Sequence, residues 1–376
     1  ANYETVNIET AKNTAGTVTT GEIQTLTATS ATSVVLTGAA DVFIGSVTGG
    51  AMTSFDASAA TGKVDVGFGT NDKITATASA TKDTVFKFGT TLNNDDTVVG
   101  GTSTKDEVTA ELTGRTAVTG KLNLSGIETL DVDTTGTNTL DLSGVTGLTS
   151  LELGANKQTI TGFDFGTTIV IDDAVGSVKV TAADATGTSD TLKFKTKVVD
   201  TAESDTIEAA DIENLSITVT DADAGTDRKQ TYVLTKFEGT SVTATEASDS
   251  ADTVPVDLGT LHKNTTTIDL SGIKGTQEAS LANATSAATI TLSGNAAATI
   301  TGSAYGDTFT IGKTAAAIVH DITGGDGTDI VNITSDGGAW NPSDIAAETL
   351  NITLTAGNDV TLGAGEGFNA ASTAIT

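Results

Sequence analysis

Alternation of apolar and polar residues runs through almost the whole chain and constrains its fold more than any other feature. A period of two places successive side chains on opposite faces of a strand, so this pattern predicts β-strands. The segment 342–350 offers at most two turns of helix, and no other segment has a convincing amphipathic pattern. The clearest alternating segments are TVNIET at 5–10, KVDVGFG at 63–69, TLDVDT at 129–134, SVKVTA at 177–182, LSITVT at 215–220 and TLNITLT at 349–355.

A short phrase built around glutamate returns four times. An aspartate followed two places later by an apolar residue precedes the last three copies, at Asp106, Asp190 and Asp329, and lies 22, 23 and 19 residues before the glutamate. The unit is therefore an Asp-bearing loop, a strand, a variable connection and a Glu-bearing strand. The four copies are YETVNIE at 3–9, IETLDVD at 127–133, IENLSIT at 212–218 and AETLNIT at 347–353.

Repeats without helices or cysteines favour an all-β, right-handed parallel β-solenoid. The separations between the glutamates are uneven, so we expect inserted hairpins or small β-domains. The segment 216–237 is the clearest expected hairpin, because polar turn residues separate two alternating strands. A string of tandem β-sandwich domains also alternates and turns often, and it stays open as the alternative.

The repeat units divide the chain into four expected parts. The first glutamate phrase begins at residue 3 with no aspartate loop before it, so we expect the chain to be a fragment of a longer protein. The parts are a solenoid segment at 1–112, a second solenoid segment at 113–195, an inserted hairpin or β-domain region at 196–265 and a solenoid segment with calcium loops at 266–376.

The charge balance excludes several classes of partner. With 48 acidic and 19 basic residues, the formal net charge is −29, which would repel nucleic acid and anionic lipid. The chain has no cysteine and no stretch of transmembrane length. Absence of cysteine in a chain of 376 residues favours an extracellular protein without disulfides.

A glycine- and aspartate-rich loop, GGDGTDIVN at 324–332, points to a metal. It fits the calcium-binding nonapeptide G-G-x-G-x-D-x-U-x at every defined position. Ca²⁺ takes six to eight hard oxygen ligands, which glycine-rich turns supply from carbonyls and aspartate from its carboxylate. We therefore expect a calcium site formed by Gly324, Asp326 and Asp329.

Related loops predict further calcium ligands. The nearest, GSAYGDTFT at 302–310, places Asp307 at the aspartate position, 22 residues before Asp329, which suggests one coil of about 18 residues plus an insertion. Looser versions lead to Asp72, Asp106 and Asp190. For each of these aspartates the alternative is a turn in which the carboxylate bonds its own backbone.

The combination of the nonapeptide, the TSDTL loop at 188–192, TSFDASAATG at 53–62 and the IETLDV-type strands resembles the RTX-type surface-layer (S-layer) proteins of Gram-negative bacteria. The resemblance implies a calcium-dependent β-solenoid with RTX-like turns, exported by a type I secretion system. It also implies self-assembly into a two-dimensional lattice on the bacterial cell surface. Expected partners are copies of the chain, and a cell-surface polysaccharide such as lipopolysaccharide through a part outside this chain.

Enzyme functions find little support in the sequence. Only two histidines, His262 and His320, occur, and neither lies in a recognised catalytic pattern. A β-helix polysaccharide-active enzyme needs clustered acids, but adjacent aspartates on a strand point to opposite faces. We expect no catalytic residues and a structural surface-layer subunit. The alternatives are an RTX-type adhesin stalk and, second, a polysaccharide-active enzyme.

Overall fold

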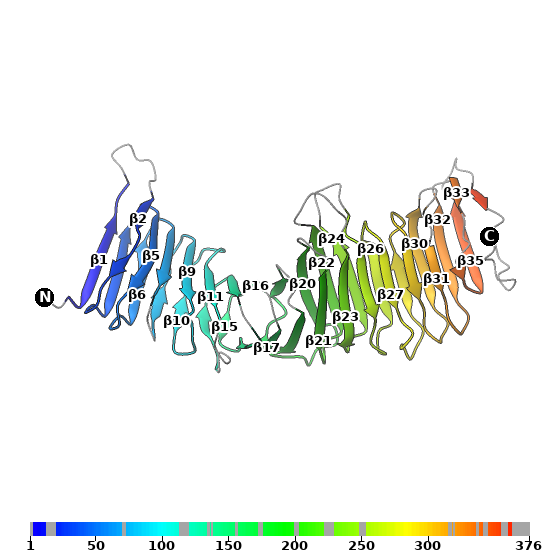
Figure 1. The fold of residues 1–376 in the computed structure, drawn as a ribbon, viewed down its shortest axis with the longest axis horizontal. Helices are drawn as coiled ribbons and strands as arrows, with labels where there is room; N and C mark the ends of the chain where they lie inside the picture. The colour runs from blue at the N-terminus through cyan, green and yellow to red at the C-terminus, as the bar shows by residue number, and fades with distance from the viewer. Residues whose placement is uncertain are drawn as a thin grey trace. The chain divides into compact units, whose positions relative to one another are not determined.

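A computed structural model of the chain shows an all-β architecture, and every regular element among the described residues is a strand. The strands stack in parallel as a β-solenoid of about 13 turns (Figure 1). In the part of the chain that is described, no helix could cross a membrane. The structure describes residues 3–12, 20–69, 73–112, 120–133, 136, 138–154, 157–171, 176–198, 203–221, 229–247, 253–314, 318, 320–335, 338–340, 345–354 and 360–362.

The predicted β-solenoid is confirmed, and the tandem-sandwich alternative is wrong. Immunoglobulin-like sandwiches are built from antiparallel sheets, whereas the strands here pair in parallel with the strand one coil away, as β28 (Thr289–Leu292) does with β30 (Thr308–Thr314). The chain divides into two compact units, Ala1–Val170 with Thr181–Ala183, and Ile171–Val180 with Asp184–Thr376.

The first unit contains two main parallel sheets. Sheet A consists of β1 (Thr5–Thr10), β4 (Ser33–Gly38), β6 (Ser54–Ala60), β8 (Thr75–Thr77), β10 (Thr97–Val99), β12 (Asn123–Ser125) and β15 (Val145–Thr146). Sheet B consists of β2 (Gly21–Ile23), β3 (Leu26–Thr27), β5 (Val42–Thr48), β7 (Val64–Phe68), β9 (Thr84–Gly89), β11 (Glu107–Glu111), β13 (Thr129–Asp133) and β16 (Ser150–Leu153). In addition, β14 (Asn138–Asp141) pairs with β17 (Gln158–Phe163), and β18 (Thr168–Ile171) ends at the unit boundary.

The second unit repeats the two-sheet plan. Its sheet B consists of β20 (Thr191–Val198), β22 (Asn214–Asp221), β24 (Ser241–Glu246), β26 (Thr267–Gly272), β28, β30, β32 (Ile330–Ser335) and β35 (Thr349–Leu354). Its sheet C consists of β19 (Ser177–Ala182), β21 (Glu203–Ala209), β23 (Gln230–Phe237), β25 (Val256–Thr260), β27 (Gln277–Ser280), β29 (Ala298–Thr301), β31 (His320–Thr323) and β34 (Ile345–Ala346). A short pair joins β33 (Gly338–Trp340) to β36 (Val360–Leu362).

The core lies between the two sheets of each unit. In the first unit, the ring of Phe55 on sheet A lies 5.7 Å from that of Phe68 on sheet B, centroid to centroid. In the second unit, the hydroxyl groups of Thr196 on sheet B and Tyr232 on sheet C lie 2.6 Å apart. Alternation along each strand supplies these inward residues and leaves the intervening ones on the outer face.

The hairpin expected over 216–237 is not formed. Strand β22 pairs in parallel with β20 and β24, while β23 pairs in parallel with β21 and β25. Alternation and a polar connection are common to a hairpin and to two successive strands of one coil, so the pattern could not separate them. The neighbouring coil offers β22 a parallel partner over its full eight residues. The region 196–265 therefore supplies strands β21 to β25 to the stack.

The coil length was also underestimated. Thr308 pairs directly with Ile330, so the 22 residues between Asp307 and Asp329 make one coil without the expected insertion. These two aspartates consequently lie one above the other on neighbouring coils.

Candidate functional site

Four of the five described aspartates of the predicted calcium loops occupy one structural position. Each is the residue immediately before a strand of sheet B: Asp106 before β11, Asp190 before β20, Asp307 before β30 and Asp329 before β32. Asp72 lies outside the described residues. This position is the last residue of a turn, directly before the strand begins.

The Asp-to-Glu spacing of the repeat has a direct structural explanation. The glutamate carboxylate accepts a hydrogen bond from the backbone N–H of the aspartate one coil earlier. Glu128 Oε2 lies 2.9 Å from the nitrogen of Asp106, and Glu348 Oε2 lies 2.7 Å from that of Asp329. Glu213 accepts from Asp190 in the same way, at 2.9 Å. The three separations of 22, 23 and 19 residues are therefore three coil lengths.

The aspartates continue this ladder. Asp329 Oδ1 accepts from the backbone N–H of Asp307 at 2.8 Å, and Asp307 Oδ1 accepts from Ala288 at 2.7 Å. Asp106 Oδ1 accepts from Thr84 at 2.8 Å. Each carboxylate thus binds the turn of the preceding coil, and we call this arrangement the carboxylate ladder. The first glutamate phrase, at 3–9, is not part of it, because its strand β1 belongs to sheet A.

Two ladder aspartates use their second oxygen as well. Asp307 Oδ2 accepts from the N–H of Ser303 at 2.6 Å, and Asp106 Oδ2 accepts from that of Gly101 at 2.7 Å. Both aspartates are fully buried. Burial raises the pKa of Asp106, and the two backbone N–H groups oppose that rise.

Asp329 differs from them in its second oxygen. Its Oδ2 is buried and has no hydrogen-bond partner among the described residues. Burial raises the pKa of Asp329, and the negative charges of Glu348 and Asp307 add to the effect. An unpartnered carboxylate oxygen beside two further carboxylates is an arrangement that a cation would stabilise.

The glycines of the nonapeptide serve the same turn. Asp329 Oδ2 packs against Gly324 so closely that a Cβ there would collide with it. Gly325 has φ +106°, a left-handed conformation that disfavours other residues, and a side chain there would meet the carbonyl of Ser303. Asp326 is exposed, so the loop directs Asp329 inward and Asp326 toward solvent.

The ladder fits calcium only in part. At Asp106 and Asp307 both carboxylate oxygens face N–H donors, which a cation would have to displace. Of the aspartates in the predicted calcium loops, Asp329 and Asp190 each have a buried Oδ2 without a hydrogen-bond partner within the described segments. No group of three or more acidic or histidine residues with metal-site geometry occurs among the residues placed by the structure.

One aspartate outside the carboxylate ladder, on sheet A, binds the preceding coil in the same way and was not singled out from the sequence as a candidate. Asp96, before β10 on sheet A, accepts from the N–H of Ile74 at 2.8 Å and from that of Asn93 at 2.8 Å. It begins the triplet DTV, which has the same Asp-x-apolar pattern as the others. The Asp-x-apolar pattern could therefore have identified Asp96 from the sequence. Its hydrogen bonds show that an aspartate before a strand can bind the preceding coil on sheet A as well as on sheet B.

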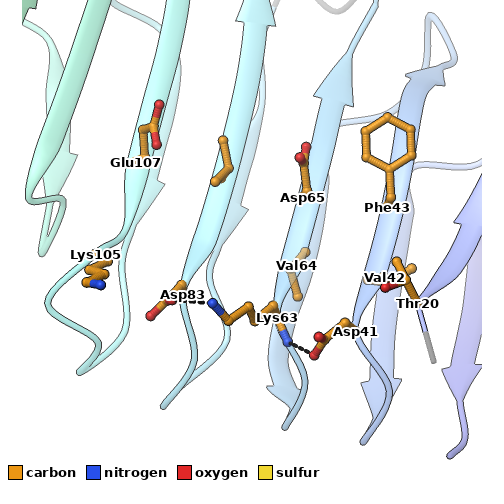
Figure 2. A pocket seen from close by; sticks show the side chains of 11 residues that line it. Thr20, Asp41, Val42, Phe43, Lys63, Val64, Asp65, Asp83, Lys105 and Glu107 are labelled. Atoms are coloured by element: carbon orange, nitrogen blue, oxygen red, sulfur yellow. Dashed lines mark hydrogen bonds and ion pairs between the residues drawn. The ribbon is translucent and has the colours of Figure 1, made fainter. Parts of the chain in front are cut away.

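A second candidate site is a groove of about 530 Å³ on the outer face of sheet B in the first unit. Along its edge, residues of alternating charge stand on successive coils, and Figure 2 shows Lys63 between Asp41 and Asp83, with Lys105 beyond. Lys63 Nζ lies 2.9 Å from Asp83 Oδ2, and the backbone N–H of Lys63 donates to Asp41 Oδ1 at 2.8 Å. The hydrogen bonds from Ser103 and Lys63 lower the pKa of Asp83.

The groove floor combines an aromatic ring with charges. The registered column across β5, β7, β9 and β11 is Phe43, Asp65, Val85 and Glu107. Lys87 Nζ lies 2.7 Å from Asp65 Oδ2 and 5.4 Å from the centroid of the Phe43 ring. Burial, followed by the charge of Glu152, raises the pKa of Glu107. A ring flanked by hydrogen-bonding groups suits a polar ligand such as a sugar.

His320 is a buried titratable group outside both candidate sites. It is 2% exposed on the inner side of β31, and neither ring nitrogen has a hydrogen-bond partner within the described residues. Burial lowers its pKa to about 4. A buried neutral imidazole without hydrogen-bond partners among the described residues is a feature of the core rather than of a catalytic site.

Comparison with known proteins adds no identity. No family model, no curated protein and no solved structure was found to match the chain. The function must therefore be argued from the residues above.

Proposed function

We propose that this chain is a structural subunit of a bacterial surface layer, secreted by a type I system and assembling with copies of itself in a calcium-dependent lattice. The observation that carries the proposal is the stack of Asp307, Asp329 and Glu348 on three successive coils, with Oδ2 of Asp329 buried and unpartnered. An extracellular scaffold needs a repetitive body, and the stacked coils within each unit supply one.

Calcium has a physical role in this proposal. The chain carries a formal charge of −29, and charges of one sign destabilise a compact state. Asp329 Oδ2 and the carbonyl groups of the loop at 324–328 are the oxygens that would hold the ion there. When bound, the ion supplies positive charge beside three carboxylates.

The first test is calcium removal. We expect chelator to lower the melting temperature, and Asp329→Ala to bind one ion fewer than wild type in titration calorimetry. Asp321→Ala is the matched control, because that aspartate is exposed on sheet C, outside the loop. An unchanged melting curve in excess chelator, or equal stoichiometry in wild type and Asp329→Ala, contradicts the calcium site.

The second test is assembly. Electron microscopy of the full chain should show ordered sheets in millimolar calcium and single particles in chelator, while sodium chloride at matched ionic strength should not substitute. Monovalent salt only screens charges, over about 8–10 Å. Sheets in sodium chloride alone would contradict calcium dependence, and a monomeric rod that binds a host surface would favour the adhesin stalk.

The groove around Phe43 supports a second candidate, binding of a polysaccharide on sheet B of the first unit. The raised pKa of Glu107 and the adjacent ring are the observations that favour it. Glycan binding lost in Phe43→Ala and in Glu107→Gln, with folding retained, would support it. Hydrolysis of a bound glycan, lost in Glu107→Gln, would indicate the enzyme alternative.

A further inference from the structure

The outer face of sheet B in the second unit differs in its chemistry from the outer face of sheet C on the same coils. Two adjacent columns of outward residues run through six successive coils from β24 to β35, and ten of their twelve residues are Ser, Thr or Asn. We call this surface the threonine face. It consists of Ser241, Thr267, Thr289, Thr308, Ile330 and Thr349 in one column and Thr243, Asp269, Thr291, Thr310, Asn332 and Asn351 in the other.

The threonine face is almost free of charge. Asp269 is its one charged residue, and its Oδ1 already accepts hydrogen bonds from the N–H and the hydroxyl of Ser271, at 2.9 and 2.6 Å. The opposite sheet of the same coils is different. Its registered outward column includes Asp257, Glu278 and Asp321.

Neutrality matters because the whole chain is strongly acidic. Two copies that meet through carboxylate-bearing faces pay for like-charge repulsion and for desolvation of each charge. Hydroxyl and amide groups can replace their hydrogen bonds to water with hydrogen bonds to the other copy. The methyl groups of the threonines add apolar area to the contact. The Asn351 amide already donates to Asn332 Oδ1 across the coils at 2.8 Å, so the face is ordered.

We propose that the threonine face is a self-association surface that packs against the same face of a second copy. This proposal rests on the proposed function in one respect, the self-assembly of the chain, and it assigns that assembly a surface. Two copies that meet through the same face are related by a two-fold axis. The outward side chains of the two facing sheets then interdigitate, with the sheets about 10 Å apart. Six strands at about 4.8 Å cover roughly 24 Å, so a single contact is weak and needs high protein concentration.

The experiment places charge on the face. Thr291→Glu with Thr310→Glu puts two carboxylates per copy at its centre. The matched control is Thr299→Glu with Thr323→Glu, the same two substitutions at outward positions of sheet C. Sedimentation velocity of the full chain over a concentration series, in calcium at fixed ionic strength, measures the dissociation constant. Circular dichroism and thermal unfolding verify that both variants are folded.

We expect wild type and control to self-associate equally, and the face variant to bind itself at least about tenfold more weakly. Thr291→Lys with Thr310→Lys should also weaken self-association, and mixing it with the Glu variant should restore it. A face variant that associates as well as wild type, a control that weakens equally, or a mixture that stays dissociated overturns the proposal.

The outcomes separate this surface from the proposed function. Ordered sheets that form equally in wild type and in the face variant retain the surface-layer function and overturn the threonine face. Face-dependent association without ordered sheets supports the face and contradicts the lattice. A wild type that stays monomeric at the highest concentration overturns the face. That includes a monomer whose face binds ice or a glycan instead.

Discussion

Sheet B has the same interior in the two units and a different exterior. In both, inward apolar residues alternate with outward polar ones, and a carboxylate before the strand binds the preceding coil, as Asp106 and Asp307 do. On the outer face, the first unit carries the paired charges of Lys63 and Asp83, whereas the second carries the nearly neutral threonine face. The solenoid therefore constrains the interior and the turns, and leaves the outer face free to diverge in function.

The two cores also differ in their polar content. The first unit packs a cluster of phenylalanines, in which the rings of Phe68 and Phe88 lie 5.0 Å apart. The second unit buries the Thr196–Tyr232 hydrogen bond and the unpartnered imidazole of His320. Acid should therefore affect the second unit more strongly, because the buried His320, whose pKa is lowered by burial, belongs to it.

The largest expected effect tests whether the ladder is equally important in both units. Asp307→Ala leaves the buried N–H groups of Ala288 and Ser303 without an acceptor. Asp106→Ala does the same to the buried N–H of Thr84 and the half-buried N–H of Gly101. Each variant should lose about 2–6 kcal/mol, since two buried donors cost about 1–3 kcal/mol each. Urea unfolding followed by circular dichroism measures the loss. If only one variant is destabilised, the ladder is not a common device.

A smaller effect is expected from glycines with positive φ. Gly325→Ala in the second unit combines a left-handed conformation with a collision against the Ser303 carbonyl, whereas Gly89 in the first, at φ +50°, has open space around it. Gly89→Ala should cost about 1 kcal/mol from conformation alone. Gly325→Ala should cost roughly 2–4 kcal/mol, because the backbone must also move. Equal losses in urea unfolding would show that the calcium loop is not tightly packed.

The part of the acid response that depends on His320 should be confined to the second unit. The folded-state pKa of His320 is lowered from 6.5 to about 4, so its contribution to stability is present above pH 6.5 and is lost as the pH falls through 4. Between pH 7 and pH 5, wild type should lose about 2 kcal/mol relative to His320→Gln.

This response is checked by the pH dependence of stability in wild type and His320→Gln and by hydrogen exchange. The raised pKa values of Asp106 and Asp329 act in the opposite direction, but they are common to wild type and variant and cancel in the difference. Hydrogen exchange at both pH values should show the change in the second unit. Parallel pH curves for wild type and His320→Gln would contradict the prediction.

The smallest effect concerns the charged edge of the groove. Lys63→Gln removes the ion pair with Asp83, and because the Lys63 side chain is 64% exposed, we expect no resolvable change in the urea midpoint. The charged residues on the outside of the first unit could then be replaced without loss of stability, as the comparison of the two outer faces implies. A clear loss of stability would mean that the charged edge holds the coils together.

Part of the candidate site could be predicted from local spacing. The Asp-to-Glu phrase identified the turns before β11, β20 and β32, because its aspartate and glutamate lie one coil apart and so keep a similar separation in the sequence. Asp96 was missed even though it begins the same Asp-x-apolar triplet. The use of these carboxylates as acceptors for the preceding coil could not be read, because the N–H donors of Thr84 and Ala288 lie in other parts of the sequence.

The sequence alone determined most of the strands and their inward and outward residues, because period-two alternation is a local property of the chain. It favoured the parallel solenoid but left tandem β-sandwiches open. Pairing was decided only by the tertiary structure: the segment 216–237 has a hairpin pattern, yet both its strands pair with neighbouring coils. The threonine face likewise exists only after stacking, since Thr291 and Thr310 are neighbours through the register of β28 with β30. The register pairs residues that lie one coil apart in the sequence. The free energy that favours one register over another therefore depends on contacts between coils, which no local pattern encodes.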